Sequence, residues 1–363
     1  MLDCSVSSDL VKTRVIEASA PFTRTADLML GDSVCDPLKR DEFQDRAISA
    51  AAANWQLHDV TVVPPHGLVF SGGHMVKQTG WGFHPRQIEA AEAALAQPHC
   101  RLDDRPVFVG LNRFFGNYFH VLTQIVPAIA GYRTEPGFRQ GRLLVGVHSP
   151  VLHHALQLCG VGIPEIVSIA TMPPIDVGTL TLSSLLTPCD DPSPFCLSVF
   201  DRMIERAMAP VGGPLPQRIY VWRVDSKMRP LRNEIELVVM LSRFGIEPVV
   251  LSMLGLDEQI RLFRNARLVI GPHGAGLANV VFAAPGAVLY ELLPDHYITP
   301  CVCQLARLRG LHYWCDVHRS EARPGLWRHD TPWTVDVDAV ARRVTEILST
   351  YDLSDRRGSV AEV

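Results

Sequence analysis

Lysine is scarce in this sequence: only four lysines stand among 34 basic residues, so arginine supplies nearly all of the positive charge. The acidic residues number 38, which leaves a formal net charge of −4 and gives no reason to expect nucleic acid as a partner. Long apolar runs are also missing. No stretch reaches the roughly eighteen apolar residues of a transmembrane helix, and residues 1–24 lack the continuous apolar core of a signal peptide. These absences do not exclude a peripheral contact with a membrane.

Paired cysteine motifs are absent as well. The nine cysteines are an odd number and form no Cys-x-x-Cys, whereas a zinc site needs tighter paired spacing, so we expect no bound metal. Cys301 and Cys303 fall in an apolar stretch that is typical of a helix, which predicts buried thiols. Thiols rather than disulfides favour a reducing compartment, so we expect a cytoplasmic location, or one at the inner face of the membrane.

The length of 363 residues suits two domains of roughly 150 residues each. Segments of strand and helix character alternate with short links from Pro106 onward, which predicts the α/β class. Three prolines and two glycines in 210–216 mark the best domain boundary. The predicted division is therefore 1–105, a region of short strands in the N-terminal domain; 106–209, the rest of that domain; 210–335, a second domain; and 336–363, a closing helix and tail.

Alternation is most regular in the second half, from the strand 218–222 to the strand 311–317. It predicts a doubly wound parallel sheet of about five strands. In the first half, helical spacing runs over 118–132 with Pro127 inside, and a proline there should kink or interrupt the helix.

A glycine-rich loop follows the apolar strand Val269–Ile270 and precedes a predicted helix around 277–283. Glycines let the backbone approach a phosphate closely, and N–H groups at a helix start attract anions. A tight turn that needs glycine for its shape alone is the alternative. We favour anion binding and assign to it His273, Gly274, Ala275, Gly276, Leu277 and Asn279.

Basic residues follow the strand 218–222. Arg223 stands at its carboxyl end, where it should face the same edge of the sheet as the glycine-rich loop and neutralise a bound diphosphate. Lys227 is a second candidate for that anion, although a solvated basic loop is the better explanation for it. Asn233 opens the next helix; capping, with Glu236 as its partner, is the default explanation for it, and Glu234 lies beside it.

A lone carboxylate, Glu291, stands within the apolar strand 288–292. Burying a carboxylate without a partner is costly, so the residue needs a reason to be there. At a strand end of such a domain it can bind both hydroxyls of a ribose. A salt bridge with a nearby arginine is an equally good alternative.

In the first half, Asn117, Tyr118 and His120 open the helix after the apolar run 107–109. The ordinary pKa range of histidine suits the removal of a proton from a hydroxyl, so His120 is a candidate general base. A histidine packed against the sheet with one hydrogen bond is the alternative.

The ordered set of these residues resembles glycosyltransferase family 61. The resemblance covers about 107–317 and is carried by Arg218-Ile219-Tyr220-Val221-Trp222-Arg223, Asn233-Glu234, Gln259, Gly271-Pro272-His273-Gly274-Ala275-Gly276-Leu277, Pro285-Gly286, Glu291, and upstream by Asn117-Tyr118-Phe119-His120 with Pro127. It implies a GT-B architecture, in which two Rossmann-like domains with parallel sheets face a cleft.

The same resemblance implies an inverting transferase that uses a nucleotide sugar, which we expect to be a UDP-sugar, with neither metal nor cofactor. The expected acceptor is a glycan or glycolipid in bacterial capsular or exopolysaccharide biosynthesis. His120 and Arg223 would then be catalytic, while Lys227 and Asn233 join the donor site and Asn117, Tyr118 and Gln124 meet the acceptor. Asp336-Val337-Asp338 fits a metal-clamping DxD pattern, but it opens the final helix, where acidic caps are expected.

Gln124 stands where the family pattern has an acidic residue. Glutamine cannot act as a base, so the proton falls to His120 or to another group. A nucleotide-sugar epimerase or hydrolase, and an inactive nucleotide- or glycan-binding partner in a polysaccharide assembly complex, are the alternative functions. Product analysis separates the first from a transferase, and any turnover removes the second.

Overall fold

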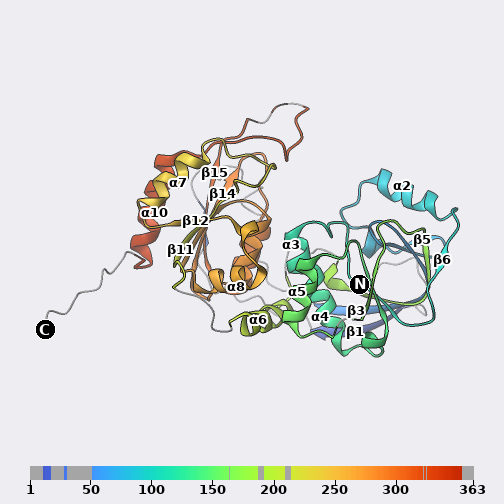
Figure 1. Cartoon of the computed structure of the whole chain (residues 1–363). Coiled ribbons are helices and arrows are strands. Elements are labelled where there is room, and N and C mark those ends of the chain that lie inside the picture. The colour runs from blue at the N-terminus through green and yellow to red at the C-terminus, as the bar shows by residue number, and fades with distance from the viewer. Residues whose placement is uncertain are drawn as a thin grey trace. The chain divides into compact units, whose positions relative to one another are not determined.

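The computed structural model describes residues 11–17, 28–30, 51–162, 164–186, 192–208, 214–321, 323 and 325–353 (Figure 1). These residues form two compact units, each with its own sheet. The N-terminal unit takes its described residues from 1–23 and 45–210, and the C-terminal unit takes them from 24–44 and 211–363. Within these ranges, no helix combines the length and the apolar character needed to cross a membrane.

The sheet of the N-terminal unit is mixed. Its strands lie in the order β5-β4-β3-β10-β7-β8-β9, with β1 paired to β3 and β6 paired to β10. β7, β8 and β9 run parallel, and β10 is parallel to β7 but antiparallel to β3. The strands are β1 (Val11–Glu17), β3 (Ala52–Val63), β4 (Leu68–Ser71), β5 (His74–Met75), β6 (Cys100–Arg101), β7 (Val107–Val109), β8 (Arg142–Val145), β9 (Glu165–Ser168) and β10 (Ile175–Ser183).

The prediction of a doubly wound parallel sheet is therefore wrong for part of this unit. β3, β4 and β5 pair antiparallel, and residues 64–67 and 72–73 are their only links. Links this short join antiparallel neighbours, because a parallel connection needs about a dozen residues. Gly67, Gly72 and Gly73 have φ of 75°, 54° and 81°, the left-handed conformation that such turns require.

The helices of this unit are α2 (Pro85–Ala94), α3 (Tyr118–His120), α4 (Val126–Gly131), α5 (Pro150–Cys159) and α6 (Phe195–Ala207). A π-helical turn, Val121–Ile125, separates α3 from α4 and comes just before Pro127. The ring of Pro127 would clash with the carbonyl of Thr123 in a regular α-helix, and the wider turn avoids that clash. The predicted interruption of the helix is confirmed.

Every pair of neighbouring strands in the C-terminal unit is parallel. The order is β12-β11-β13-β14-β15-β2. The strands are β2 (Leu28–Leu30), β11 (Arg218–Val221), β12 (Glu247–Val249), β13 (Leu268–Pro272), β14 (Val288–Pro294) and β15 (His312–His318). The edge strand β2 departs from the predicted division, which placed all of 1–105 in the N-terminal domain. Its three residues gave no strand signal of their own, because their pairing with β15 is a contact across nearly 300 positions of the chain.

Helices cover both faces of this sheet, as predicted. The helices are α7 (Glu234–Ser242), α8 (Leu256–Asn265), α9 (Cys301–Arg309) and α10 (Val337–Thr350). Figure 1 shows α7 and α10 together on one side of the sheet and α8 on the other. α7 and α10 share a core with Tyr220, Tyr290 and Trp314, and with Trp333, which is fully buried. Asp336 caps α10 through the backbone N–H of Ala339, as the sequence predicted.

Candidate active site

Strand order locates a crevice in the C-terminal unit. The chain passes from β11 to β12 on one side and then returns to place β13 on the other side of β11. In open parallel sheets, ligands bind at the carboxyl ends of the strands where the order reverses in this way. A pocket of about 250 Å³ lies at this point, lined by Trp222, Arg223, Ser226, Arg229, Glu234 and Pro272 among others.

Arg223 follows β11 directly and is held by oxygen atoms of the protein. Its Nη1 donates to the carbonyl of His273 at 2.8 Å, and its Nη2 donates to Ser226 Oγ at 2.8 Å and to the carbonyl of Met228 at 2.9 Å. Burial, and to a lesser degree the charge of Arg229, lowers the pKa of Arg223 to about 10, so it stays protonated at neutral pH. Its guanidinium is therefore a fixed positive charge.

Arg229 supplies a second guanidinium. It is 8% exposed, its φ is 49°, and its Nε is buried without a hydrogen-bond partner among the described residues. Nη1 donates to His329 Nδ1 at 2.7 Å, and the guanidinium lies 4.6 Å from the ring centre of Tyr297. Burial and the charges of Arg229 and Arg328 lower the pKa of His329 to about 4, so this histidine accepts as a neutral ring. The sequence analysis did not select Arg229, since nothing in a basic loop indicates which of its arginines is buried.

A part-buried cation and a buried one therefore line the same pocket. Among the described residues, neither Arg223 nor Arg229 forms an ion pair with a carboxylate. A buried charge without a counterion is costly, and a bound anion would offset that cost.

The loop after β13 wraps around Arg223. A Cβ on Gly274 would come within 3.1 Å of the guanidinium carbon of Arg223, so a larger residue here would push the guanidinium by a few tenths of an ångström. The helix predicted after this loop is present as the 3₁₀ helix Ala275–Phe282. Ala275 and Gly276 are half-buried and keep their backbone near the surface.

Two of the predicted donor residues serve the loop instead of a ligand. Leu277 is fully buried, and its N–H donates to the carbonyl of Gly274 at 3.0 Å. Asn279 is fully buried and donates to Gln259 Oε1 at 2.9 Å and to the carbonyl of Gly276 at 3.1 Å. Their polar groups are therefore engaged within the protein.

His273 is held by a buried carboxylate. Its Nδ1 lies 2.6 Å from Glu291 Oε1, and Tyr313 donates its hydroxyl to Glu291 Oε2 at 2.5 Å. Glu291 is fully buried and both of its oxygens are engaged, so its contacts do not favour the ribose-binding function expected of it. The carboxylate instead fixes the orientation of the His273 ring and directs Nε2 away from Glu291.

Glu234 is the carboxyl group that lines the pocket. It is 8% exposed and accepts hydrogen bonds from the Tyr220 hydroxyl at 2.8 Å and the Arg223 N–H at 3.1 Å. Burial raises its pKa. Asn233 bonds to both backbone polar groups of Val335 rather than capping α7 through its side chain, which corrects the predicted capping box. Lys227 is exposed and stands outside the pocket lining.

In the N-terminal unit, His120 lies at the end of α3 and stacks on Phe114, with 4.5 Å between ring centres and 18° between planes. Burial lowers the pKa of His120, which favours the neutral ring. Asn117 is the helix cap, since its Oδ1 accepts from the N–H of Phe119 at 3.0 Å. Tyr118 begins the helix and is half-buried.

A relay of amides sets the tautomer of His120. The backbone N–H of Phe114 can only donate, so it fixes Asn112 Oδ1 as an acceptor at 2.9 Å. Asn112 Nδ2 then donates to Gln124 Oε1 at 2.8 Å, and the same oxygen lies 2.8 Å from His120 Nδ1. Nδ1 therefore carries the proton, and Nε2 keeps a free lone pair. Asn112 was missed in the sequence analysis because it lies in a loop with no recognisable pattern.

One family match includes residues from both sets. Residues 118–290 match the model of the family Glycosyltransferase 61. The stretch begins two residues before His120, contains Gln124, Arg223 and His273, and ends one residue before Glu291.

Curated proteins with similar sequences include animal and plant transferases. The EGF domain-specific O-linked N-acetylglucosamine transferase of Bos taurus is 33% identical over 124 residues, or 33% of this chain and 23% of that protein. The β-1,2-xylosyltransferase of Arabidopsis thaliana is 28% identical over 112 residues, or 30% of this chain and 19% of that protein. The matches span less than a quarter of either relative. The expected part in bacterial polysaccharide assembly stays a prediction.

Proposed function

We propose that this chain transfers a sugar from a nucleotide-sugar donor to a hydroxyl of a glycan, glycolipid or protein acceptor, with inversion at the anomeric carbon. The observation that carries the proposal is the pair of guanidiniums in one pocket lining, part-buried Arg223 and buried Arg229, at the reversal of strand order. They suit a diphosphate, whose oxygens would accept charge-assisted hydrogen bonds from both guanidiniums, whereas the carboxyl group of Glu234 in the same lining bonds to Tyr220 and to the backbone of Arg223.

The donor diphosphate would lie against Arg223, Arg229 and the half-buried backbone of Ala275 and Gly276. His273, oriented by Glu291, would direct Nε2 toward a phosphate oxygen. As the bond between the sugar and the phosphate breaks, negative charge grows on the leaving oxygen, and fixed positive charge stabilises it without reorganisation. The two arginines would thus provide the charge stabilisation that a divalent cation supplies in other transferases, so the proposed reaction is metal-independent.

The acceptor hydroxyl would lie at His120 in a GT-B arrangement of the two units. Nε2 of His120 takes the hydroxyl proton while the acceptor oxygen forms a bond to the anomeric carbon. The bond from that carbon to the phosphate oxygen breaks, and the nucleoside diphosphate leaves with the electron pair. One displacement of this kind inverts the anomeric configuration, and a buried, neutral His120 suits the base.

The relatives suggest which donors to examine first. One is named for N-acetylglucosamine and the other for xylose, so UDP-N-acetylglucosamine and UDP-xylose lead the proposal. A polysaccharide of a bacterial capsule or exopolysaccharide is the acceptor that we propose alongside them.

Isothermal titration calorimetry of the full chain with UDP, GDP and CMP, with and without EDTA, tests the donor site. We expect one nucleotide to bind, unaffected by EDTA, and Arg229→Ala to weaken its affinity about 10-fold or more, because charge-assisted hydrogen bonds are lost. His273→Ala should weaken it as well.

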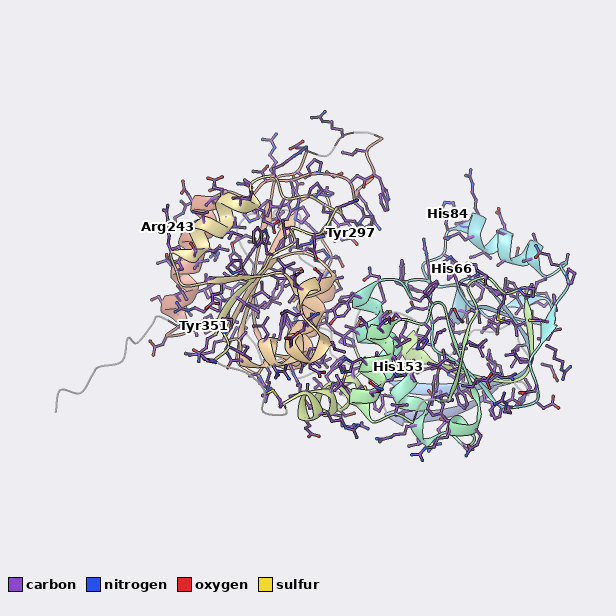
Figure 2. The ribbon with its side chains drawn as sticks, in the orientation of Figure 1. His66, His84, His153, Arg243, Tyr297 and Tyr351 are labelled. Carbon is purple, nitrogen blue, oxygen red and sulfur yellow. The ribbon has the colours of Figure 1, made fainter. Side chains whose placement is uncertain are left out.

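Arg243→Ala is the matched control, because it removes an exposed arginine at the end of α7. Figure 2 shows Arg243 and Tyr297, the ring beside Arg229, at opposite sides of the C-terminal unit. The control should bind the nucleotide as the unchanged protein does. Absence of binding to all three nucleotides would contradict the proposed function.

A further inference from the structure

Aromatic rings gather on the N-terminal unit beside His120. Phe114 stacks on His120, and Trp81 meets Phe114 edge to face with 6.0 Å between ring centres. His66 lies 5.5 Å from Phe83, measured in the same way. The rings of His66, Trp81, Phe83 and Phe114 come from three separate segments: the turn after β3, the loop before α2 and the loop after β7. The mechanism proposed above uses none of these four rings and only the neighbouring His120.

Trp81 is the exposed member of this group. Its side chain is 44% exposed, although a tryptophan gains most stability when buried. Gly82 follows it with φ of 72°, and a Cβ on Gly82 would contact Phe114 at 3.5 Å. The left-handed glycine thus turns the chain tightly against Phe114 between Trp81 and Phe83. The exposed indole face is therefore a consequence of a defined turn.

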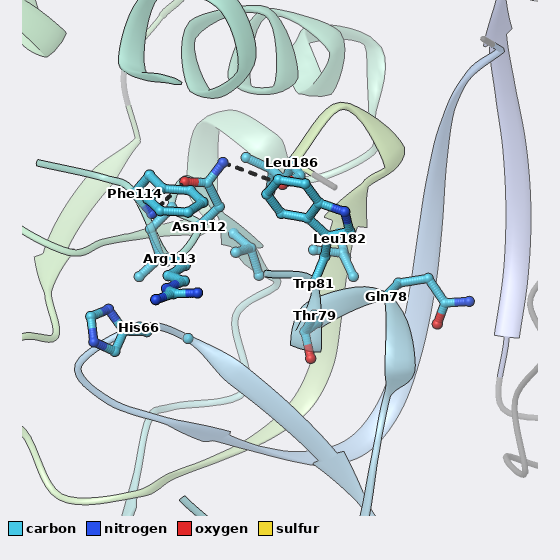
Figure 3. Close-up of a pocket in the computed structure, with 12 residues that line it drawn as sticks. His66, Gln78, Thr79, Trp81, Asn112, Arg113, Phe114, Leu182 and Leu186 are labelled. Atoms are coloured by element: carbon cyan, nitrogen blue, oxygen red, sulfur yellow. Dashed lines mark hydrogen bonds between the residues drawn. The ribbon is translucent and has the colours of Figure 1, made fainter. Parts of the chain in front are cut away.

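Two polar groups within this aromatic cluster have no hydrogen bond or ion pair with the described residues. The guanidinium of Arg113 lies 5.1 Å from the ring centre of Phe114 and 5.5 Å from that of Phe83, and among the described residues it has no ion pair. Nδ1 of His66 is buried without a hydrogen bond. Burial, together with the charge of Arg113, lowers the pKa of His66. Figure 3 shows His66 close to the side chain of Arg113. Unsatisfied groups of this kind need a ligand or water to complete them.

The depression that these residues line is small. Its volume of about 20 Å³ has room for about one water molecule. A ligand would therefore rest on the aromatic surface rather than enter a pocket. A pyranose ring suits that surface, because its C–H groups carry partial positive charge and pack on the negative face of an indole. Its hydroxyl oxygens accept hydrogen bonds from a guanidinium.

We propose that Trp81, Phe114 and Arg113 form a saccharide-binding subsite, in which a pyranose of the acceptor stacks on Trp81 with its hydroxyls toward Arg113. Through Phe114 the subsite is continuous with His120, which takes the proton of the acceptor hydroxyl. The description of the sugar as an acceptor rests on the proposed function, whereas the contact between sugar and protein does not.

Saturation-transfer-difference NMR on the full chain tests the subsite with three probes: methyl β-D-glucopyranoside, methyl β-D-galactopyranoside and methyl β-D-glucuronide. We expect transfer to the ring protons of at least one glycoside, and a drop of about 5-fold in Trp81→Ala, as the loss of an aromatic contact predicts. Arg113→Met, which keeps an apolar side chain between Phe83 and Phe114, should reduce transfer to the same glycoside. It also provides a second test if Trp81→Ala fails to fold.

Met208→Ala is the control, since Met208 is similarly exposed, at 47%, and ends α6 of the same unit. Transfer should be unchanged in this variant. No transfer to any glycoside, or equal transfer in Trp81→Ala and the unchanged protein, overturns the inference. UDP titrated into the same samples keeps the two proposals apart: UDP binding without sugar contact sinks the subsite alone, and sugar contact without UDP binding sinks the donor site alone.

Discussion

The two units handle charge in opposite ways. In the C-terminal unit, part-buried Arg223 and buried Arg229 form no ion pair with a carboxylate of the described residues, and the carboxylate of Glu291 orients His273. In the N-terminal unit, the neutral amides of Asn112 and Gln124 orient His120. The difference matches the two tasks that we propose. A leaving diphosphate needs fixed positive charge, whereas a histidine that acts as a general base needs a free lone pair and therefore a neutral ring.

His120→Ala is the strongest test of this difference between the two units. If the neutral unit supplies the base, turnover should fall by about 10²- to 10⁴-fold, the usual contribution of general base catalysis. Nucleotide affinity should stay within about 2-fold, because the two sites use different residues. His74→Ala, an exposed histidine in β5, should leave both quantities unchanged. Unchanged turnover in His120→Ala would refute the assignment of the base.

Arg223→Ala tests the charged unit. The dissociation constant of the bound nucleotide, measured by calorimetry, should rise about 10- to 100-fold, since hydrogen bonds to charged groups contribute about 1.5–3 kcal/mol. Arg223→Lys should recover only part of the affinity, because a lysine keeps the charge but cannot donate to three oxygens in a planar fork. Full recovery in Arg223→Lys would show that charge alone suffices.

Glu291→Gln separates two explanations of a buried carboxylate. If Glu291 orients His273 and accepts from Tyr313, the free energy of unfolding in urea should drop by about 1–3 kcal/mol. If it binds a ribose instead, the change should fall on nucleotide affinity and leave stability intact. Glu247→Gln, an exposed carboxylate in β12, is the control for stability.

Gln124→Glu sharpens the comparison by adding charge to the neutral unit. A carboxylate at this place would favour the imidazolium form and raise the pKa of His120, which burial otherwise lowers. The base works only when it is unprotonated. As the solution is acidified, the activity of Gln124→Glu should therefore begin to fall at a higher pH than that of the unchanged protein, and the acid limb of kcat/KM should be displaced upward by about 1 pH unit. Gln97→Glu, at an exposed position, should leave the profile where it was. An unmoved acid limb in Gln124→Glu would show that His120 is not the titrating base.

Sequence patterns identified Arg223 and His273, two residues that the order of the strands in the sheet brings close together. Arg223 and His273 each follow a short apolar strand, and parallel strands place their carboxyl ends at one edge of a sheet. Such positions can be read from local patterns alone. The functions of these residues were harder to read, since the two partners of Glu291 lie 18 and 22 positions away in the chain.

The residues that the sequence did not indicate owe their importance to tertiary contacts. Arg229 is buried because 327–333 packs over it, and Asn112 matters because Gln124 lies on the next helix. Residues 1–105 showed no motif with a recognisable chemical function. His66 and Trp81 of this region nevertheless line one depression together with Arg113. The mixed sheet of the N-terminal unit could in principle have been predicted from the sequence, since the four-residue link 64–67 already indicates a hairpin.

The edge strand β2 has a practical consequence for dissecting the molecule. Its hydrogen bonds cover the outer side of β15, so a fragment that starts after residue 213 would expose β15 as an unprotected edge containing Tyr313, Trp314 and Cys315. Bare edges of this kind pair with other chains and promote aggregation. During synthesis, β2 leaves the ribosome before nearly all the rest of the C-terminal unit, so it cannot pair until β15 has been synthesised. A circularly permuted chain in which 24–44 follows residue 353 would supply the missing strand to an isolated C-terminal unit.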